Sequence, residues 1–557
     1  MVQNPVKILA VCLILSISLA PAWGAGQMLA SSGKLMYWGN TTVRYTFDPG
    51  SLGSLTASQA RELVTNAFGT WQNVETASIR FQQSGTFGSD VTAQNVSAVL
   101  DTAQANGQNP IIFDNDGSIL NLLVGQGSAA SILGLTHVSA AANGLISYAW
   151  VVYNGNFVGS NGYTAEGYLN TAVHELGHFI GLDHCQVFRH LAYNGYGPDD
   201  QYIPVMFPTT TDDETERPLL ANDDRVSVSL AYPESSFSTL YGEIQGRVLY
   251  SSGMAFRGVN VAARKVDDPL AVVTTCVSDY LQQRNGDYRL RGLPPGEYLI
   301  WIEPIDTAFY GSSQVGPYTE TTSGLSFTQV AFSEYYSGTA ENYDESSDPR
   351  SQATPVSVSA GEIVKNTDIL AKINSSSSSE SKIQILASGF PETGAIKGRR
   401  GYMTMGTYQF LFTVSEEDDY IRIETQNDPA KQLSLYLRRD APADFNHYDL
   451  ILRGKGTWKS VYSPSDNPPL QAGRYFIGIV NSTESLIPYT ITITGVHIPE
   501  GDLNGDGWKD RQDLFYFSTQ WRRTATELNA RGDLAKDERN RIDRADLVQF
   551  LKRVMEP

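Results

Sequence analysis

Three histidines with a fixed spacing constrain this chain more than any other feature. Residues 174–184 read His-Glu-Leu-Gly-His-Phe-Ile-Gly-Leu-Asp-His, which is the pattern H-E-x-x-H-x-x-G-x-x-H. Residues four apart on a helix share a face, so the imidazoles of His174 and His178 can bind one metal ion. Gly181 can adopt the left-handed backbone conformation that ends a helix, and the chain can then bring His184 back as a third ligand.

Glu175 follows the first histidine, where its carboxylate can act on a metal-bound water without being a ligand. Three histidines, an open fourth position and an adjacent carboxylate are the parts of a catalytic zinc site. The chain has only seven histidines, and three of them belong to this set. The complete motif resembles that of the metzincin metallopeptidases. That resemblance implies a zinc-dependent endopeptidase, in which Glu175 is the general base toward a zinc-activated water.

Residues 36–236 are predicted to form one α/β unit. Strands are expected at residues 37–38, 43–47, 77–82, 110–113, 132–138 and 146–153, and helices from Thr56 or Ser58 to about Val74 and through the histidine motif. This order of strand, helix, several strands and metal-binding helix is similar to the matrixin branch of the metzincins. The resemblance implies a metzincin catalytic domain with a mixed twisted sheet and long helices.

Two segments after the histidine motif also resemble segments of metzincins. Residues 203–208 resemble the methionine-containing turn of metzincins, which implies that Met206 forms an apolar floor beneath the imidazoles; an unrelated buried methionine is the alternative. Phe207 stands where some branches carry a tyrosine near the metal. Residues 220–233 resemble the closing matrixin helix, which Asp223 and Asp224 begin, where its dipole favours negative charge.

The stretch between His184 and Met206 is longer than is usual for matrixins and is a candidate for shaping a substrate pocket. Its polar and aromatic residues include Arg189, His190, Tyr193, Tyr196, Asp199 and Asp200.

Other polar residues of this unit have ordinary interpretations beside functional ones. Residues 114–117, Asp-Asn-Asp-Gly, predict a turn with two carboxylates pointing outward, and a structural calcium site is the alternative. His137 is expected to be a packed or surface residue, with a second, structural zinc as the alternative. Cys185 and Cys276 are either two free thiols or one interdomain bridge, and their number excludes a disulfide framework.

Residues 1–24 are predicted to be a secretory signal peptide. Lys7 precedes an apolar run over residues 8–20, and small residues follow at Ala22 and Gly24. We therefore expect a secreted protein, extracellular or associated with the cell surface. About a dozen residues without cysteine separate this segment from the first strand, so no propeptide with a zinc-capping thiol is expected.

The remainder of the chain is predicted to contain two β-sandwich domains. Residues 242–373 alternate apolar and polar residues in short runs and resemble carboxypeptidase-regulatory-like modules. A serine-rich linker follows at residues 374–382. Residues 383–497 resemble the bacterial prepeptidase C-terminal domain, with an unrelated sandwich as the alternative.

The C-terminal residues 500–555 are predicted to form a small helical calcium-binding module. Oxygen ligands occur at the loop positions that Ca²⁺ requires, from the side chains of Asp502, Asn504, Asp506, Asp510 and Asp513 and the carbonyl of Trp508. Together with Gly-Asp-Leu at 532–534, this resembles a dockerin type I module and implies docking to a cohesin-like partner. The second repeat, residues 533–546, has Ala535 in place of a ligand, so calcium binding there stays open.

The net charge and the apolar runs of the chain limit the classes of partner that it can bind. The formal net charge of −19 argues against a nucleic-acid partner and against docking to an anionic membrane surface. No apolar run after the signal segment is long enough to span a membrane. We expect a protein or peptide substrate. The alternative is a non-catalytic secreted adhesion or scaffold protein with a vestigial peptidase domain, whose mark would be a missing histidine or glutamate; none is missing.

Overall fold

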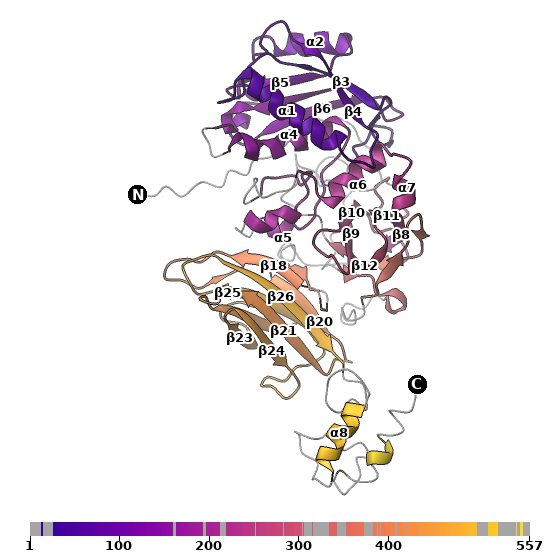
Figure 1. Ribbon diagram of the computed structural model, residues 1–557, viewed down its shortest axis with the longest axis vertical. Coiled ribbons are helices and arrows are strands. Elements are labelled where there is room, and N and C mark those ends of the chain that lie inside the picture. Colours follow the sequence, from indigo (N-terminus) through magenta and orange to yellow (C-terminus); the bar gives the residue numbers. More distant parts are fainter. Residues whose placement is uncertain are drawn as a thin grey trace.

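The computed structural model shows a multidomain, sheet-rich molecule with five sheets among the residues that it describes (Figure 1). Those residues are 13–14, 26–159, 163–192, 197–211, 219–250, 252–281, 283–303, 305, 315, 334–341, 353–371, 383–386, 388–389, 391–406, 409–416, 418–497, 511–521, 542 and 546–549.

The first domain is built on a mixed sheet, which has seven strands where six were expected. Its strands are β1 (Leu13–Ile14), β2 (Tyr37–Trp38), β3 (Thr42–Phe47), β4 (Arg80–Thr86), β5 (Pro110–Asp114), β6 (Gly134–Ala140) and β7 (Leu145–Asn154). The order is β1-β6-β7-β5-β3-β4, and β2 also pairs with β7. Strand β6 runs antiparallel to β7, whereas β3, β4, β5 and β7 are mutually parallel.

Two long helices cover this sheet, namely α1 (Ala57–Gln72) and α4 (Ala165–Phe179). Thr56 caps α1 in a reciprocal capping box with Gln59. The predicted apolar stripe of α1 is buried at Ala60, Leu63, Val64, Ala67, Phe68 and Trp71. Shorter helices are α2 (Val96–Ala105), α3 (Ser118–Leu123), α5 (Arg189–Ala192), α6 (Asn222–Ala231) and α7 (Phe237–Leu240), with 3₁₀ turns η1 (Ser128–Ala130), η2 (Gly155–Phe157) and η3 (Gly197–Tyr202).

Two details of the first domain differ from the sequence-based expectation. Strand β4 begins at Arg80 rather than at residue 77, because Ala77 bridges to Pro233 and the amide of Ser78 donates to the carbonyl of Tyr232. Helices α2 and α3 were not predicted. Helix α2 begins after Asn95, a residue type that is common at this position, although the Asn95 side chain makes no capping hydrogen bond.

The second module, residues 242–371, packs two sheets around one apolar core. One sheet contains β9 (Asn260–Lys265), β10 (Val273–Val277), β12 (Gly296–Glu303), β13 (Glu334–Tyr335) and β14 (Val356–Val358); the other contains β8 (Gly242–Leu249), β11 (Asp287–Leu293), β15 (Ile363–Val364) and β16 (Ile369–Leu370). Ile244, Val261, Leu290 and Ile300 are among the core residues.

The third module, residues 383–497, repeats this two-sheet arrangement. Its sheets contain β17 (Ile383–Ile385), β19 (Thr404–Met405), β20 (Gln409–Val414), β22 (Leu433–Arg439), β23 (Leu450–Gly454) and β25 (Gly473–Asn481), and β18 (Pro391–Ile396), β21 (Tyr420–Asn427), β24 (Thr457–Tyr462) and β26 (Ile487–Val496). Helix α8 (Arg511–Gln520) follows near the C-terminus (Figure 1). None of the helices in the described part of the chain has the length and apolar character needed to cross a membrane.

Candidate metal centre and active site

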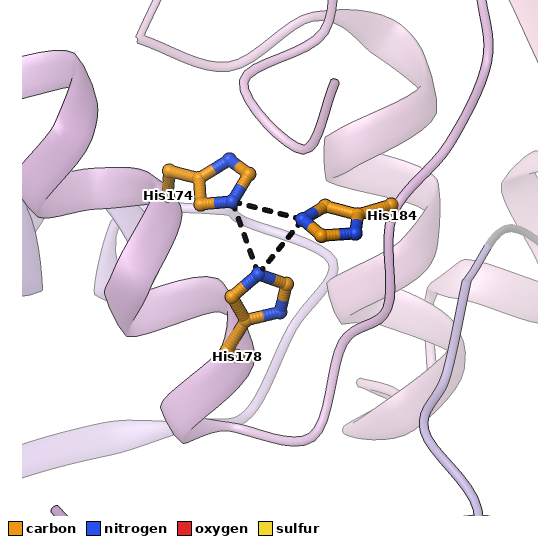
Figure 2. A group of neighbouring side chains, drawn as sticks. All are labelled: His174, His178 and His184. Atoms are coloured by element: carbon orange, nitrogen blue, oxygen red, sulfur yellow. Dashed lines mark hydrogen bonds between the residues drawn. The ribbon is translucent and has the colours of Figure 1, made fainter. Parts of the chain in front are cut away.

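Helix α4 presents the first two histidines of the motif from one side. Its N-terminus is fixed by Thr164, whose side-chain oxygen accepts a hydrogen bond from the amide of Gly167 (3.1 Å). The helix packs against α1 and β6 and is buried along most of its length. His174 and His178 therefore project from a rigid, interior helix (Figure 2).

A glycine ends α4 and returns the chain toward the site. Gly181 has a φ of 90°, in the left-handed region. Its amide donates to the carbonyl of His178 (2.8 Å), and the amide of Leu182 donates to the carbonyl of Gly177 (2.9 Å). This pair of bonds is a Schellman motif, which depends on the left-handed residue. The reversal brings His184 to face the helix, as the spacing predicted (Figure 2).

The three imidazoles converge on one point through their Nε2 atoms. The Nε2 atom of His178 lies 3.0 Å from that of His174 and 3.1 Å from that of His184, and the third separation is 3.2 Å. Three ligands at about 2.0–2.1 Å from a tetrahedral Zn²⁺ would be about 3.3–3.4 Å apart. The arrangement therefore fits zinc with only a small outward movement of the rings.

Backbone carbonyls orient two of the rings. The Nδ1 atom of His174 lies 2.6 Å from the carbonyl oxygen of Val205, and that of His178 lies 2.8 Å from that of Leu182. A carbonyl only accepts, so each Nδ1 carries the hydrogen and each Nε2 offers its lone pair to the shared point. Burial lowers the pKa of His178 to about 4, which keeps this ring neutral, the form that binds metal.

The predicted methionine turn lies against α4. Met206 is buried, and its sulfur contacts Gly177, so that any side chain at position 177 would collide with it. The Asp224 carboxylate accepts hydrogen bonds from the amides of Val205 (2.8 Å) and Met206 (3.1 Å), and from that of Ala221 (2.8 Å). Asp224 thus anchors the turn as well as standing at the start of α6, and the anchoring role was not predicted.

Glu175 is held by strand β6. Its carboxylate accepts a hydrogen bond from the hydroxyl of Thr136 (2.5 Å), and both side chains are fully buried. A Cβ atom at Gly134, on the same strand, would lie 2.6 Å from the Glu175 Cγ. Neither Gly134 nor Thr136 was predicted to contact the site. Their place in a predicted strand is a signal, but it does not specify which helix residue they contact.

Comparison with known protein families agrees with this geometry. Residues 37–232 match the matrixin family model. The match supports a matrixin-type metallopeptidase domain, and the family implies a catalytic zinc. Among the described residues, His174, His178 and His184 are the one group of three or more side chains found close enough together to hold a metal ion.

Similar solved structures are distant from this chain. The pre-peptidase C-terminal domain of a Bacillus anthracis collagenase is 12% identical with a TM-score of 0.16, over 20% of this chain and 94% of that one. A periplasmic inhibitor of g-type lysozyme from Aeromonas hydrophila is 11% identical with a TM-score of 0.13, over 20% and 96%. A DUF3823 family protein from Parabacteroides merdae is 12% identical with a TM-score of 0.12, over 46% and 98%. No curated protein matched the sequence.

The acidic start of α6 joins the matrixin-type domain to the second module. Asp223 is buried, and its Oδ1 atom accepts from the amide (2.7 Å) and the hydroxyl (3.1 Å) of Thr275. The pKa of Asp223 is raised to about 7 by burial and by the nearby charge of Asp224, against hydrogen bonds that include one from Cys185. Cys185 and Cys276 are both buried free thiols, so no bridge joins them.

The long segment after His184 lies at the contact between modules. Arg189, Asp199 and Asp200 are buried, and α5 packs against β18 of the third module (Figure 1). His190 lies 3.9 Å from the Glu392 carboxylate. Helix α5 is thus in contact with the third module, and the expected role of this segment in shaping a substrate pocket stays a prediction. Tyr193 and Tyr196 lie outside the described residues.

The turn at residues 114–117 differs from the prediction. Asp114 is buried, and its carboxylate accepts from the amide of Leu120 in α3 (2.8 Å), so its expected outward orientation is wrong. Asp116 accepts from the amide of Ser118 (3.0 Å), which makes both carboxylates part of the start of α3. His137 is half-buried and stacks on Trp150, in agreement with its interpretation as a packed residue.

The predicted calcium loop lies outside the described residues at Asp502, Asn504, Asp506, Trp508 and Asp510. Asp513 falls within the backbone of α8, but its side chain is not described.

Proposed function

We propose that this chain is a secreted zinc-dependent endopeptidase acting on extracellular proteins or peptides. The observation that carries the proposal is the convergence of three imidazoles beside a buried glutamate, within the part that matches the matrixin family. We further propose a metzincin-type catalytic domain, in which Met206 forms the apolar floor of the site.

In this proposal His174, His178 and His184 hold the metal. Bound Zn²⁺ supplies a Lewis acid that polarises the scissile carbonyl and lowers the pKa of a water. Glu175 takes a proton from the water as its oxygen attacks the carbonyl carbon. The carboxyl then gives this proton to the departing amide nitrogen as the C–N bond breaks. Thr136 limits the movement of the Glu175 carboxylate during both transfers.

The remaining parts of the proposal rest on the sequence. Residues 1–24 would direct export, and the loop from Asp502 to Asp513 would bind Ca²⁺ through oxygen ligands. A cohesin-like partner for residues 500–555 is implied by the dockerin-like pattern.

The decisive variant is Glu175→Ala in the full chain. We expect it to bind one zinc ion with wild-type affinity, because the three imidazoles are unchanged, and to lose cleavage of a peptide library by at least about 100-fold in kcat. Zinc content is measured by elemental analysis and cleavage by mass spectrometry. Chelation should abolish wild-type cleavage, and added zinc should restore it.

Glu166→Gln is the matched control, because Glu166 lies in the first turn of the same helix and is exposed. It should retain wild-type activity. Full activity of Glu175→Ala would reject Glu175 as the general base, and wild-type cleavage that resists chelation would reject a zinc-dependent peptidase. Absence of cleavage by the wild type at any pH would favour the non-catalytic adhesion or scaffold role.

A further inference from the structure

His184 belongs to neither a helix nor a strand. The chain runs without regular structure from the end of α4 to α5 at Arg189, and the third histidine lies within this stretch. Backbone bonds from the first domain reach this stretch at Gly181, Asp183 and Cys185. The Met28 amide donates to the carbonyl of Gly181 (2.7 Å), the Asp183 amide to that of Gly26 (2.5 Å) and the Cys185 amide to that of Met206 (3.1 Å). Such a segment needs further support if its ligand is to stay within a few tenths of an ångström of the metal.

The second module supplies polar contacts before the histidine. The hydroxyl of Tyr280 lies 3.2 Å from the Asp183 carboxylate and 3.0 Å from the carbonyl oxygen of Gln27. The same carboxylate accepts from the backbone amide of His184 (2.8 Å). Tyr280 is buried, so this contact is shielded from water.

The second module also contacts the residues that follow His184. The side-chain amide of Asn260 donates to the carbonyl of Gln186 (2.8 Å), and the side-chain amide of Gln186 donates to the Glu303 carboxylate (3.1 Å). Asn260 also donates to Glu303 (2.8 Å), which closes a three-membered polar cluster. Both amide side chains are buried. The histidine segment is thus held on either side by strands and loops of a different module.

A third set of contacts reaches the methionine turn through α6. Asn222 donates to the carbonyl of Val273 in β10 (3.0 Å), and Asp223 accepts from Thr275 in the same strand. The next residue, Asp224, anchors the backbone of Met206. Strand β10 therefore contacts Asp223, which is the chain neighbour of the residue that fixes the Met206 turn.

Apolar packing makes this contact rigid. The sheet of β9, β10 and β12 is buried on both faces. One face lines the core of the second module, and the other joins the core of the first domain through Ala262, Val273, Val277, Leu299 and Trp301. The two units therefore share an apolar core rather than a polar, sliding surface.

We propose that the second module is a structural part of the metal site, with Asn260 and Tyr280 as positioning residues for His184. This inference rests on the proposed zinc peptidase function. The second module contacts both the segment around His184 and, through α6, the turn that contains Met206. Losing these contacts would therefore make His184 less well positioned, while α4 and its two histidines stay in place.

The test measures zinc affinity of the full chain by competition with a chromophoric chelator. Outer contacts of metal ligands typically contribute tenfold to 100-fold in affinity, so Asn260→Ala should raise the zinc Kd at least about tenfold. Tyr280→Phe removes one hydroxyl and should raise it about threefold to tenfold. Thermal unfolding of each variant is recorded alongside.

The matched controls are Tyr298→Phe and Asn481→Ala. The Tyr298 hydroxyl donates to the carbonyl of Pro294 within the second module, and Asn481 donates to the carbonyls of Ile396 and Ser485 within the third. Both should keep the wild-type zinc Kd even where they lower Tm. Unchanged affinity in Asn260→Ala and Tyr280→Phe, or equal weakening in the controls, overturns the inference. A wild-type chain that binds no zinc overturns the proposed function itself.

Discussion

The hydroxyl of Thr136 decides where the Glu175 carboxylate lies. A glutamate side chain has several rotatable bonds, and its terminal torsion is only broadly restricted by intrinsic preference. The 2.5 Å hydrogen bond from β6 selects one orientation, and Gly134 leaves the room for it. A general base works only when its oxygen is within hydrogen-bond reach of the proton that it takes. In the proposed mechanism, the strand therefore acts on the chemistry through one hydroxyl group.

Replacing Thr136 by valine tests this contact, because the two side chains have nearly the same shape. We expect Thr136→Val to lower kcat about tenfold, since a small misplacement of a catalytic group is costly, while KM changes by less than about twofold. Thr136→Ser restores the hydroxyl and should recover most of kcat. Steady-state kinetics with zinc-loaded protein gives both constants, and a valine variant with wild-type kcat would contradict the assignment.

At the scale of elements, the site is assembled from one helix, one strand and two turns. The helix and its end could be predicted, because the histidine spacing and Gly181 are local signals. Helix α2 is also predictable from the sequence, since Val96, Val99, Leu100 and Ala103 follow a helical spacing. The burial of Asp114 could not be predicted, because an Asp-Asn-Asp-Gly turn does not indicate which carboxylate caps the next helix.

Helix α6 carries a titrating group between two modules. Asp223 has a pKa of about 7 in the folded chain, against about 3.8 when unfolded. The folded state therefore holds the extra proton between about pH 4 and 7, and stability falls as pH rises through this window. Asp223→Asn cannot titrate, so its stability relative to wild type should increase from pH 5 to pH 8, by about 2–3 kcal/mol.

Chemical denaturation of both proteins at the two pH values gives this difference. Asp267→Asn, which changes an exposed carboxylate of the second module, should follow the wild-type curve. A constant difference between wild type and Asp223→Asn at both pH values would show that Asp223 is already ionised at pH 5.

At the scale of the whole molecule, a buried ion pair joins the second and third modules. Arg264 in β9 pairs with Glu392 in β18, and both side chains are almost fully buried. The guanidinium also lies 5.2 Å from the ring centroid of Phe188 and 5.1 Å from that of Trp301. The segment after His184 is thus enclosed by both modules. Sequence alone could not predict this junction, because its members lie up to about 200 residues apart and share no periodicity.

Breaking this pair from one side should be far costlier than removing it entirely. Arg264→Met leaves a buried carboxylate without its partner and should destabilise the chain by about 3–5 kcal/mol. Combining it with Glu392→Leu should recover most of that loss. Lys459→Met, which disrupts the more exposed pair of Lys459 with Glu424, should cost less than about 1 kcal/mol. Denaturant unfolding of the four variants, Glu392→Leu included, gives the coupling energy, and additive losses would contradict the expectation.

The sheet of β9, β10 and β12, which is buried on both faces, also limits how the gene segments for these modules can be recombined. A module that meets its neighbours only through a linker can be shuffled between genes as an independent cassette. The second module cannot, because its outer face completes the apolar core of the first domain. The segment that must be exchanged as one piece therefore runs from the first strand to about residue 371. Recombination near residue 240 would separate the peptidase domain from part of its apolar core.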